Sequence, residues 1–172
     1  MTRTGSGVMA DYTYFRCPLD GYGAAFNALT ALGLSVAVTP QPAQINLRGQ
    51  SSDLTAAVAE ACGGLALAAR VNDTTATSAW HCLGLGPDEW LLVGPVTTGP
   101  EVVARLTDKL SMHHTSAVDV SSNRVVLDIS GPTAPALFAS LTSLEMARLT
   151  PGRCAQTMMA KAQVILQSGA NC

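Results

Sequence analysis

The chain has 172 residues, which is room for about one domain with a core of its own. Ten Lys and Arg residues against twelve Asp and Glu residues give a formal net charge of −2, and charged residues make up only 13% of the chain. An ordinary globular domain carries about 25%. The lack of clustered basic residues argues against DNA or RNA as partners. With 48% apolar residues, a solitary monomer would have to cover its surface with Ser, Thr, Gln, Asn and Gly, and the other solution is a partner that covers part of the surface.

The sequence contains no apolar run that approaches the ~18 residues of a membrane span. Residues 1–7 lack the apolar stretch of a signal peptide, so we expect a cytoplasmic protein without membrane contact. The five cysteines are odd in number and form no CxxC pair, which argues against a zinc ribbon and a closed disulfide framework. We expect free thiols, mostly buried.

Residues 1–19 show no clean hydrophobic period, and we expect a partly ordered N-terminal arm before a single domain over 20–172. Helical periodicity and end signals predict the helices of that domain. They are expected over 21–32, from Ser51 or Ser52 to Ala61, from Pro100 to Leu110, and from about Pro135 to Leu141. Apolar or alternating runs between turn signals predict the strands. These are expected over 34–38, 44–48, 65–71, 79–85, 90–93, 118–120, 124–129 and 163–167, with a polar loop over 72–78.

The predicted strands and helices alternate in the rough order β-α-β-β-α-β-β-α-β, with short strands and no long βαβ runs. This order is typical of an α+β domain. Two β-α-β-β blocks follow one another, which indicates a duplicated lobe.

The segment Gly21-Tyr22-Gly23-Ala24-Ala25-Phe26 begins like a dinucleotide-binding loop, in which glycines let backbone N–H groups approach a pyrophosphate. Phe26 replaces the third small residue of that pattern, and Pro18 interrupts the preceding segment. No acidic residue follows about 20 residues later. We therefore interpret the segment as a loop that leads into a helix.

Asp88 and Glu89 are adjacent carboxylates beside Trp90, and an acid next to an aromatic face can have a raised pKa that suits proton transfer. Neighbours in a turn usually point apart, however. We predict structural roles, in which Asp88 bonds turn amides and Trp90 fills the core. Asp119 and Asn123 are predicted to be the hydrogen-bonding members of a polar turn between two strands.

His113 and His114 are consecutive, so in an extended segment their side chains would point to opposite faces and could not chelate one ion. His81 and Cys82 are also consecutive, so in an extended segment their side chains would likewise point to opposite faces. A Cys/His pair formed across the fold stays open as an alternative, with Cys82 or Cys154 as the nucleophile of a small hydrolase. The residues alone therefore predict no catalytic, cofactor-binding or metal-binding site.

Four short motifs follow one another along the chain and are more specific together than singly. They are 43–49 (AQINLRG), 85–93 (LGPDEWLLV), 118–132 with its VDVS, Arg124 and SGP parts, and 151–157 (PGRCAQT). Together they resemble the gamma subunit of heterotetrameric sarcosine oxidase, and the resemblance covers about residues 43–167.

The resemblance implies a fold similar to the folate-binding domain of aminomethyltransferases, built from two related βαβ-containing lobes. In that family the complex oxidatively demethylates sarcosine or a related N-methyl amine with oxygen and tetrahydrofolate. It gives glycine, hydrogen peroxide and methylenetetrahydrofolate. The resemblance further implies that this chain is a small non-catalytic subunit, which assembles with alpha, beta and delta subunits. FAD, FMN, NAD and tetrahydrofolate would belong to those partner subunits, with no cofactor in this chain.

Two features depart from the family's pattern. The family usually continues with a further strand and helix that contain Arg, Ser and Phe, whereas residues 167–172 end this chain. Either the sequence is truncated or the chain is a shortened relative. A lobe that lacks its last strand and helix would expose a strand edge and an apolar face, and we expect the isolated chain to aggregate without partners. Gly84 also stands where the family often has Trp.

A stand-alone folate-binding or aminomethyl-transfer protein remains the alternative. It would need an acid placed to meet the pterin, and Asp119 and Asp128 are the candidates that the sequence offers.

Overall fold

The computed structural model describes residues 17–96 and 98–169, so the arm expected over 1–19 falls mostly outside the described residues. The helices are α1 (Gly23–Leu29), α2 (Ser51–Ala61), α3 (Gly99–Lys109) and α4 (Ala134–Leu141), with 3-10 turns η2 (Thr30–Leu32) and η3 (Met146–Arg148). The strands are β1 (Ser35–Thr39), β2 (Ala43–Arg48), β3 (Thr74–Ala76), β4 (His81–Gly86), β5 (Glu89–Gly94), β6 (Ser116–Asp119), β7 (Val126–Ser130), β8 (Cys154–Met159) and β9 (Ala162–Gln167). Within the described residues, no helix has the length and apolar character needed to span a membrane.

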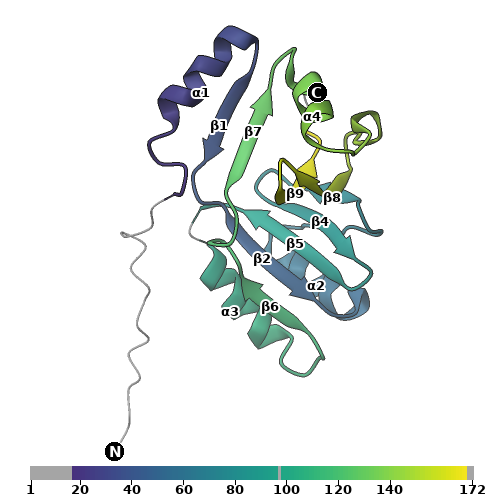
Figure 1. Cartoon of the computed structure of the whole chain (residues 1–172). Coiled ribbons are helices and arrows are strands. Elements are labelled where there is room, and N and C mark those ends of the chain that lie inside the picture. Colours follow the sequence, from purple (N-terminus) through teal and green to yellow (C-terminus); the bar gives the residue numbers. More distant parts are fainter. Residues whose placement is uncertain (1–16, 97, 170–172) are drawn as a thin grey trace, which may run out of the picture.

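The first lobe is a five-stranded antiparallel sheet with the strand order β3-β4-β5-β2-β6 (Figure 1). One face of this sheet packs against α2 and α3. There Ile45, Leu47 and Leu92 of the sheet join Leu54 and Leu106 of the helices in one core cluster. All five side chains are fully buried. Burial of this apolar face is the main force that can hold the lobe together.

The other face of the sheet carries a smaller cluster. Because side chains alternate along a strand, Leu83, Leu85 and Leu91 point away from the helices. They pack against Cys154 of β8 and Ile165 of β9. The β8–β9 ribbon therefore lies over the sheet of the first lobe.

The second lobe consists of two separate two-stranded ribbons, β1–β7 and β8–β9, with α1 and α4 (Figure 1). Its core is thin. Among the described residues, the buried hydrophobic side chains outside 43–110 are Leu34, Ala134 and Cys154. The α+β class with two βαβ-containing lobes is confirmed, but only the first lobe has a full core.

The strand expected over 65–71 is wrong, since this segment is irregular although Leu65 and Ala68 are buried. The backbone of this segment forms hydrogen bonds with side chains of other elements, and not with a neighbouring strand. Trp90 Nε1 donates to Ala68 O at 2.9 Å, and Ala68 N donates to Cys82 Sγ at 3.4 Å. Tertiary contacts thus replace the ladder that the apolar run predicted.

Two strands lie where none was expected. β3 falls inside the stretch 72–78 that was predicted as a polar loop, and β8 precedes the single strand expected near the C-terminus. β8 contains one β-branched residue, Thr157, so its strand propensity is low. Its pairing with β9 decides its conformation. The other predicted helices and strands are confirmed, with bounds shifted by one or two residues at most ends.

Candidate functional site

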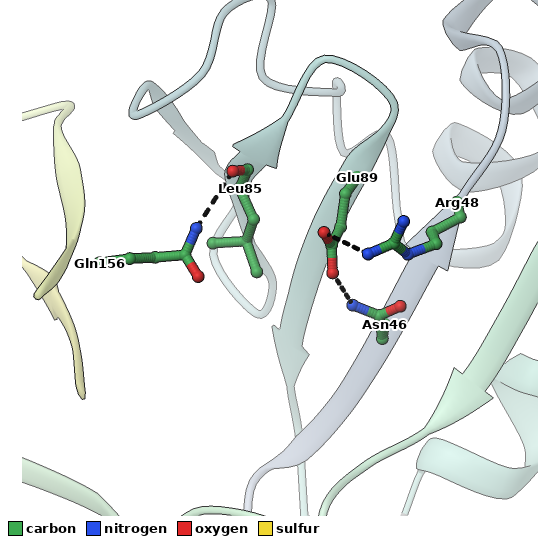
Figure 2. Close-up of polar contacts among 5 residues, drawn as sticks. All are labelled: Asn46, Arg48, Leu85, Glu89 and Gln156. Atoms are coloured by element: carbon green, nitrogen blue, oxygen red, sulfur yellow. Dashed lines mark hydrogen bonds and ion pairs between the residues drawn. The ribbon is translucent and has the colours of Figure 1, made fainter. Parts of the chain in front are cut away.

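The motifs of β2 and β5 meet around the carboxylate of Glu89, which lies between Arg48 and Asn46 (Figure 2). Arg48 Nη2 donates to Glu89 Oε2 at 2.6 Å, and Asn46 Nδ2 donates to Glu89 Oε1 at 2.8 Å. Both carboxylate oxygens therefore bond to the neighbouring strand. This arrangement fixes the register of β2 against β5, in which Arg48 is paired with Glu89.

The turn before Glu89 has the structural role that the sequence predicts. Trp90 is buried, and its indole bonds to Ala68 O. Asp88 contributes through its backbone, because its carbonyl accepts the N–H of Gly49 at 3.1 Å. The expected bonds from the Asp88 side chain to turn amides are not found among the described residues, where that side chain is exposed.

The motif of β8 holds the β8–β9 ribbon onto the first lobe. Gln156 Nε2 donates to Leu85 O at 3.1 Å (Figure 2), and Arg153 forms an ion pair with Asp73. The sequence marked Gln156 and Arg153 as parts of a motif but gave no sign of their partners. Because 71 residues separate Gln156 from Leu85, no local sequence pattern indicates that the two residues are partners.

Asp119 is engaged in the turn predicted for it. Its Oδ1 accepts the N–H of Ser121 at 2.9 Å and the Ser121 hydroxyl at 2.5 Å. Asn123 contributes its backbone N–H, which donates to Val120 O at 2.9 Å. Asp128 lies elsewhere, on β7, and accepts the hydroxyl of Thr39 at 2.7 Å. The two acids considered for folate are thus bonded within the chain, on different sheets.

The cysteines of the hydrolase alternative are buried and protonated. Burial raises the pKa of Cys82 to about 11, and it also raises the pKa of Cys154. A thiol in that state is a poor nucleophile, because the thiolate is the reactive form. His81 is exposed and its Nδ1 bonds to Gln167 Nε2 at 3.1 Å, on the ribbon rather than at Cys82. The Cys/His pair therefore gains no support.

The remaining histidines do not gather into a ligand set. His113 Nδ1 lies 3.5 Å from Asp53 Oδ2, and His114 is exposed. Within residues 17–96 and 98–169, no three His, Cys, Asp or Glu side chains come together as a metal site.

The glycine-containing segment over 21–26 forms the entry to α1, as predicted. Gly21 has a positive φ of 93°, and Gly21 and Tyr22 are exposed. A turn, not a strand, precedes the segment. A dinucleotide loop follows a strand, so this geometry does not fit one.

A groove of about 330 Å³ lies where the chain crosses between the lobes. Asp20 and Arg124 carry the charge of its lining, and they are of opposite sign. Ser121 and Thr39 also line it, but their hydroxyls donate to Asp119 and Asp128. Among the described residues, no buried side-chain polar atom lacks a hydrogen-bond partner.

Comparison with known proteins shows which family the chain resembles over these motifs. The family model described as "Sarcosine oxidase, gamma subunit family" matches residues 48–171. A sarcosine oxidase subunit gamma from Corynebacterium sp. (strain P-1) is 45% identical over 53 residues, which are 31% of this chain and 25% of that protein. Another from an Arthrobacter species is 32% identical over 93 residues, 54% of this chain and 45% of that protein. The matched regions thus span less than half the length of these relatives.

Solved structures agree with this relationship. A chain of the heterotetrameric sarcosine oxidase from Corynebacterium sp. U-96, solved with pyrrole 2-carboxylate, superimposes with a TM-score of 0.77 at 26% identity, and the match covers 89% of this chain and 80% of that chain. Aminomethyltransferase T of the glycine cleavage system from Bartonella henselae gives a TM-score of 0.52 at 13% identity over 71% of this chain and 35% of that chain, which shows a shared fold. The family match extends over most of the described residues and includes three of the four motifs completely, together with the last two residues of the first motif. The chain belongs to the sarcosine oxidase gamma subunit family.

Proposed function

We propose that this chain is a non-catalytic, gamma-type subunit of a heterotetrameric flavoenzyme that oxidatively demethylates sarcosine or a related N-methyl amine. Oxygen and tetrahydrofolate would be consumed, and glycine, hydrogen peroxide and methylenetetrahydrofolate would form, at sites on the partner subunits. Family membership carries this proposal, together with the similarity to a chain of a heterotetrameric oxidase.

The contacts of the motif residues support a structural contribution. Glu89 joins β2 to β5, Gln156 holds the β8–β9 ribbon, and Asp119 stabilises a turn. A catalytic group has to reach a substrate atom. In the described part of the chain, these side chains are instead engaged with other residues of the same chain.

The proposed partners are alpha, beta and delta subunits, and we assign FAD, FMN, NAD and tetrahydrofolate to them. The geometry at 21–26 supports this division, since the segment leads from a turn into a seven-residue helix and does not fit a dinucleotide. We propose a cytoplasmic location for the complex, which cell fractionation can check.

A stand-alone folate-binding protein is not favoured. The likeness to aminomethyltransferase T concerns the fold, and the candidate acids Asp119 and Asp128 are bonded to Ser121 and Thr39. Calorimetric titration of the isolated chain with tetrahydrofolate should give no binding heat.

Purification from the cells that produce the protein tests the proposal directly. The chain should be tagged at its own gene and isolated under mild conditions. We expect a larger complex that contains flavin and forms hydrogen peroxide when sarcosine is added. After denaturing separation, no covalently attached flavin should follow this chain. A free monomer without any flavoprotein partner would contradict the proposal.

A further inference from the structure

Residues 70–74, called the bridging segment below, bond the backbone of β4 at Gly84. The N–H of Asn72 donates to Gly84 O at 2.8 Å, and the N–H of Gly84 donates to Asp73 O at 3.0 Å. Position 84 requires glycine, because a Cβ atom there would lie 2.5 Å from Arg70 O, a backbone atom of the same segment. Gly84 therefore decides whether the bridging segment can reach β4.

The other side of the bridging segment bonds the backbone where β8 begins. The N–H of Cys154 donates to Asn72 O at 2.9 Å, and the N–H of Thr74 donates to Gly152 O at 2.8 Å. Backbone hydrogen bonds thus run from β4 through the bridging segment to β8, and they attach the β8–β9 ribbon to the sheet of the first lobe.

Two side chains close the same junction. Arg153 forms an ion pair with Asp73. Cys154 is only 3% exposed, and its Sγ lies 3.7 Å from Asp73 O and 3.9 Å from Gly84 O. β8 lies beside β4 at this point (Figure 1). The Cys154 thiol can therefore meet solvent only when β8 moves away from the bridging segment and β4.

The main core of the first lobe does not depend on the ribbon. Its members come from residues 43–117, whereas β8 and β9 pair with each other from Cys154–Gln167 to Met159–Ala162. Detachment of the ribbon would break neither the main core nor the β8–β9 ladder. It would uncover the small cluster of Leu83, Leu85 and Leu91. Units that share few buried apolar contacts can open separately from the rest of a fold.

We propose that the bridging segment controls a local opening of this chain, in which the β8–β9 ribbon leaves the first lobe as one unit while the first lobe stays folded. In the closed state the ribbon covers Leu83, Leu85 and Leu91, and in the open state these side chains and the Cys154 thiol meet solvent. Contacts within the chain carry this opening, so it can exist whether or not the chain is a subunit of an oxidase.

Thiol alkylation of the full 172-residue chain tests the opening. The probe is N-ethylmaleimide in excess, and mass spectrometry of the digested chain gives the rate of modification at each cysteine. Cys62 and Cys82 are 0% exposed in the main core, so they report unfolding of the first lobe, whereas Cys154 reports detachment of the ribbon. In the native sequence we expect Cys154 to react at least about tenfold faster than Cys62 and Cys82.

Gly84→Ala should favour the open state, because the added methyl group collides with the backbone of the bridging segment. We expect the rate at Cys154 to rise about ten- to hundredfold, as overpacking of this size allows, and the rates at Cys62 and Cys82 to change far less. Gly86→Ala on the same strand is the matched control. The nearest atom to a Cβ there is a side-chain atom, Glu89 Cβ at 3.3 Å, so the rate at Cys154 should stay close to that of the native sequence.

Arg153→Met tests the junction without any change to β4, and it serves even if Gly84→Ala does not fold. The substitution removes the ion pair with Asp73, whose side chains are partly exposed. We expect the rate at Cys154 to rise about two- to fivefold, as is typical of such pairs. Amide hydrogen exchange should become faster in β8 and β9 together and stay unchanged in β2.

Three results would overturn the proposal. Equal acceleration at Cys62, Cys82 and Cys154 would show that the chain opens only by unfolding as a whole. A rate at Cys154 that is the same in Gly84→Ala and Gly86→Ala would show that the bridging segment does not control the ribbon. Faster hydrogen exchange in β8 without β9 would show that the ribbon does not move as one unit.

Discussion

Gly99 lies directly against the carboxylate of Asp119, and a Cβ atom at position 99 would come within 2.7 Å of Asp119 Oδ2. Gly99 begins α3, and Asp119 ends β6. Ser121 holds the carboxylate in place through its N–H and its hydroxyl. A negative charge at the start of a helix is favourable, because the unbonded N–H groups there carry partial positive charge. This contact fixes α3 against the edge of the first sheet.

Substitution of Gly99 by Ala should therefore destabilise the protein by about 1–3 kcal/mol, since the added methyl group has to displace a bonded carboxylate. Urea unfolding measures the change in the free energy of unfolding. Gly23→Ala in α1 is the matched control, because a Cβ atom there meets nothing within 4 Å. Alanine at that helical position should be neutral or stabilising by up to about 1 kcal/mol. Equal stability of the two variants would contradict the role assigned to Gly99.

Glu89→Gln should weaken the contact between β2 and β5 only modestly. The ion pair with Arg48 is partly exposed, with 54% and 24% of the Arg48 and Glu89 side chains accessible. We expect a loss of about 0.5–1 kcal/mol, as is typical of exposed pairs, and a smaller loss at high salt. A double-mutant cycle with Arg48→Ala measures the coupling. In the assembled enzyme the turnover number should not change, and a large fall in turnover without a loss of stability would indicate a catalytic role for Glu89.

The sequence predicted most of the elements because their signals are local. The apolar face of α2 and the alternation of β2 can be read within a few residues. The failures are non-local. The segment 65–71 is apolar enough for a strand, but Trp90 and Cys82 bond its backbone from other elements. β8 has weak propensity and depends on β9 for its conformation.

In the candidate site, too, the local features could be predicted from the sequence and the non-local contacts could not. That Trp90 would fill the core could be predicted from its position in a turn-and-strand pattern. The partners of Glu89 and Gln156 could not, because 41 to 71 residues separate the bonded groups. The resemblance named the family from these motifs, while their physical role became visible only when the strands were paired.

Gln156→Leu should loosen the β8–β9 ribbon without unfolding the first lobe. The substitution removes the hydrogen bond to Leu85 O, whose loss costs about 1 kcal/mol. Amide hydrogen exchange should become faster in β8 and β9 and stay unchanged in β2. Gln163→Leu on β9 is the control, because its exposed side chain bonds no other residue in the described chain. If both variants behave alike, the contact with Leu85 does not anchor the ribbon.

The stability of the fold should fall between about pH 9 and pH 11 because of two buried thiols. Burial raises the pKa of Cys62 and Cys82 from 9.0 to about 11. Above pH 9 the unfolded chain loses these protons first, so deprotonation favours unfolding, and below pH 9 the contribution is fully present. Each thiol can contribute up to roughly 2 kcal/mol over this window. Urea unfolding at several pH values should show a smaller decrease for the Cys62→Ala, Cys82→Ala double variant than for the native sequence, and equal slopes would contradict the expectation.

Truncation of an apolar strand residue should cost more stability in the first lobe than in the second. Ile45→Ala removes a fully buried side chain and should cost about 2–5 kcal/mol. Leu127→Ala on β7 removes a side chain that is 38% exposed and should cost less than about 1.5 kcal/mol in the isolated chain. Thermal unfolding of the two isolated variants measures both costs. A Leu127→Ala variant that loses as much stability as the Ile45→Ala variant would contradict the thin core of the second lobe.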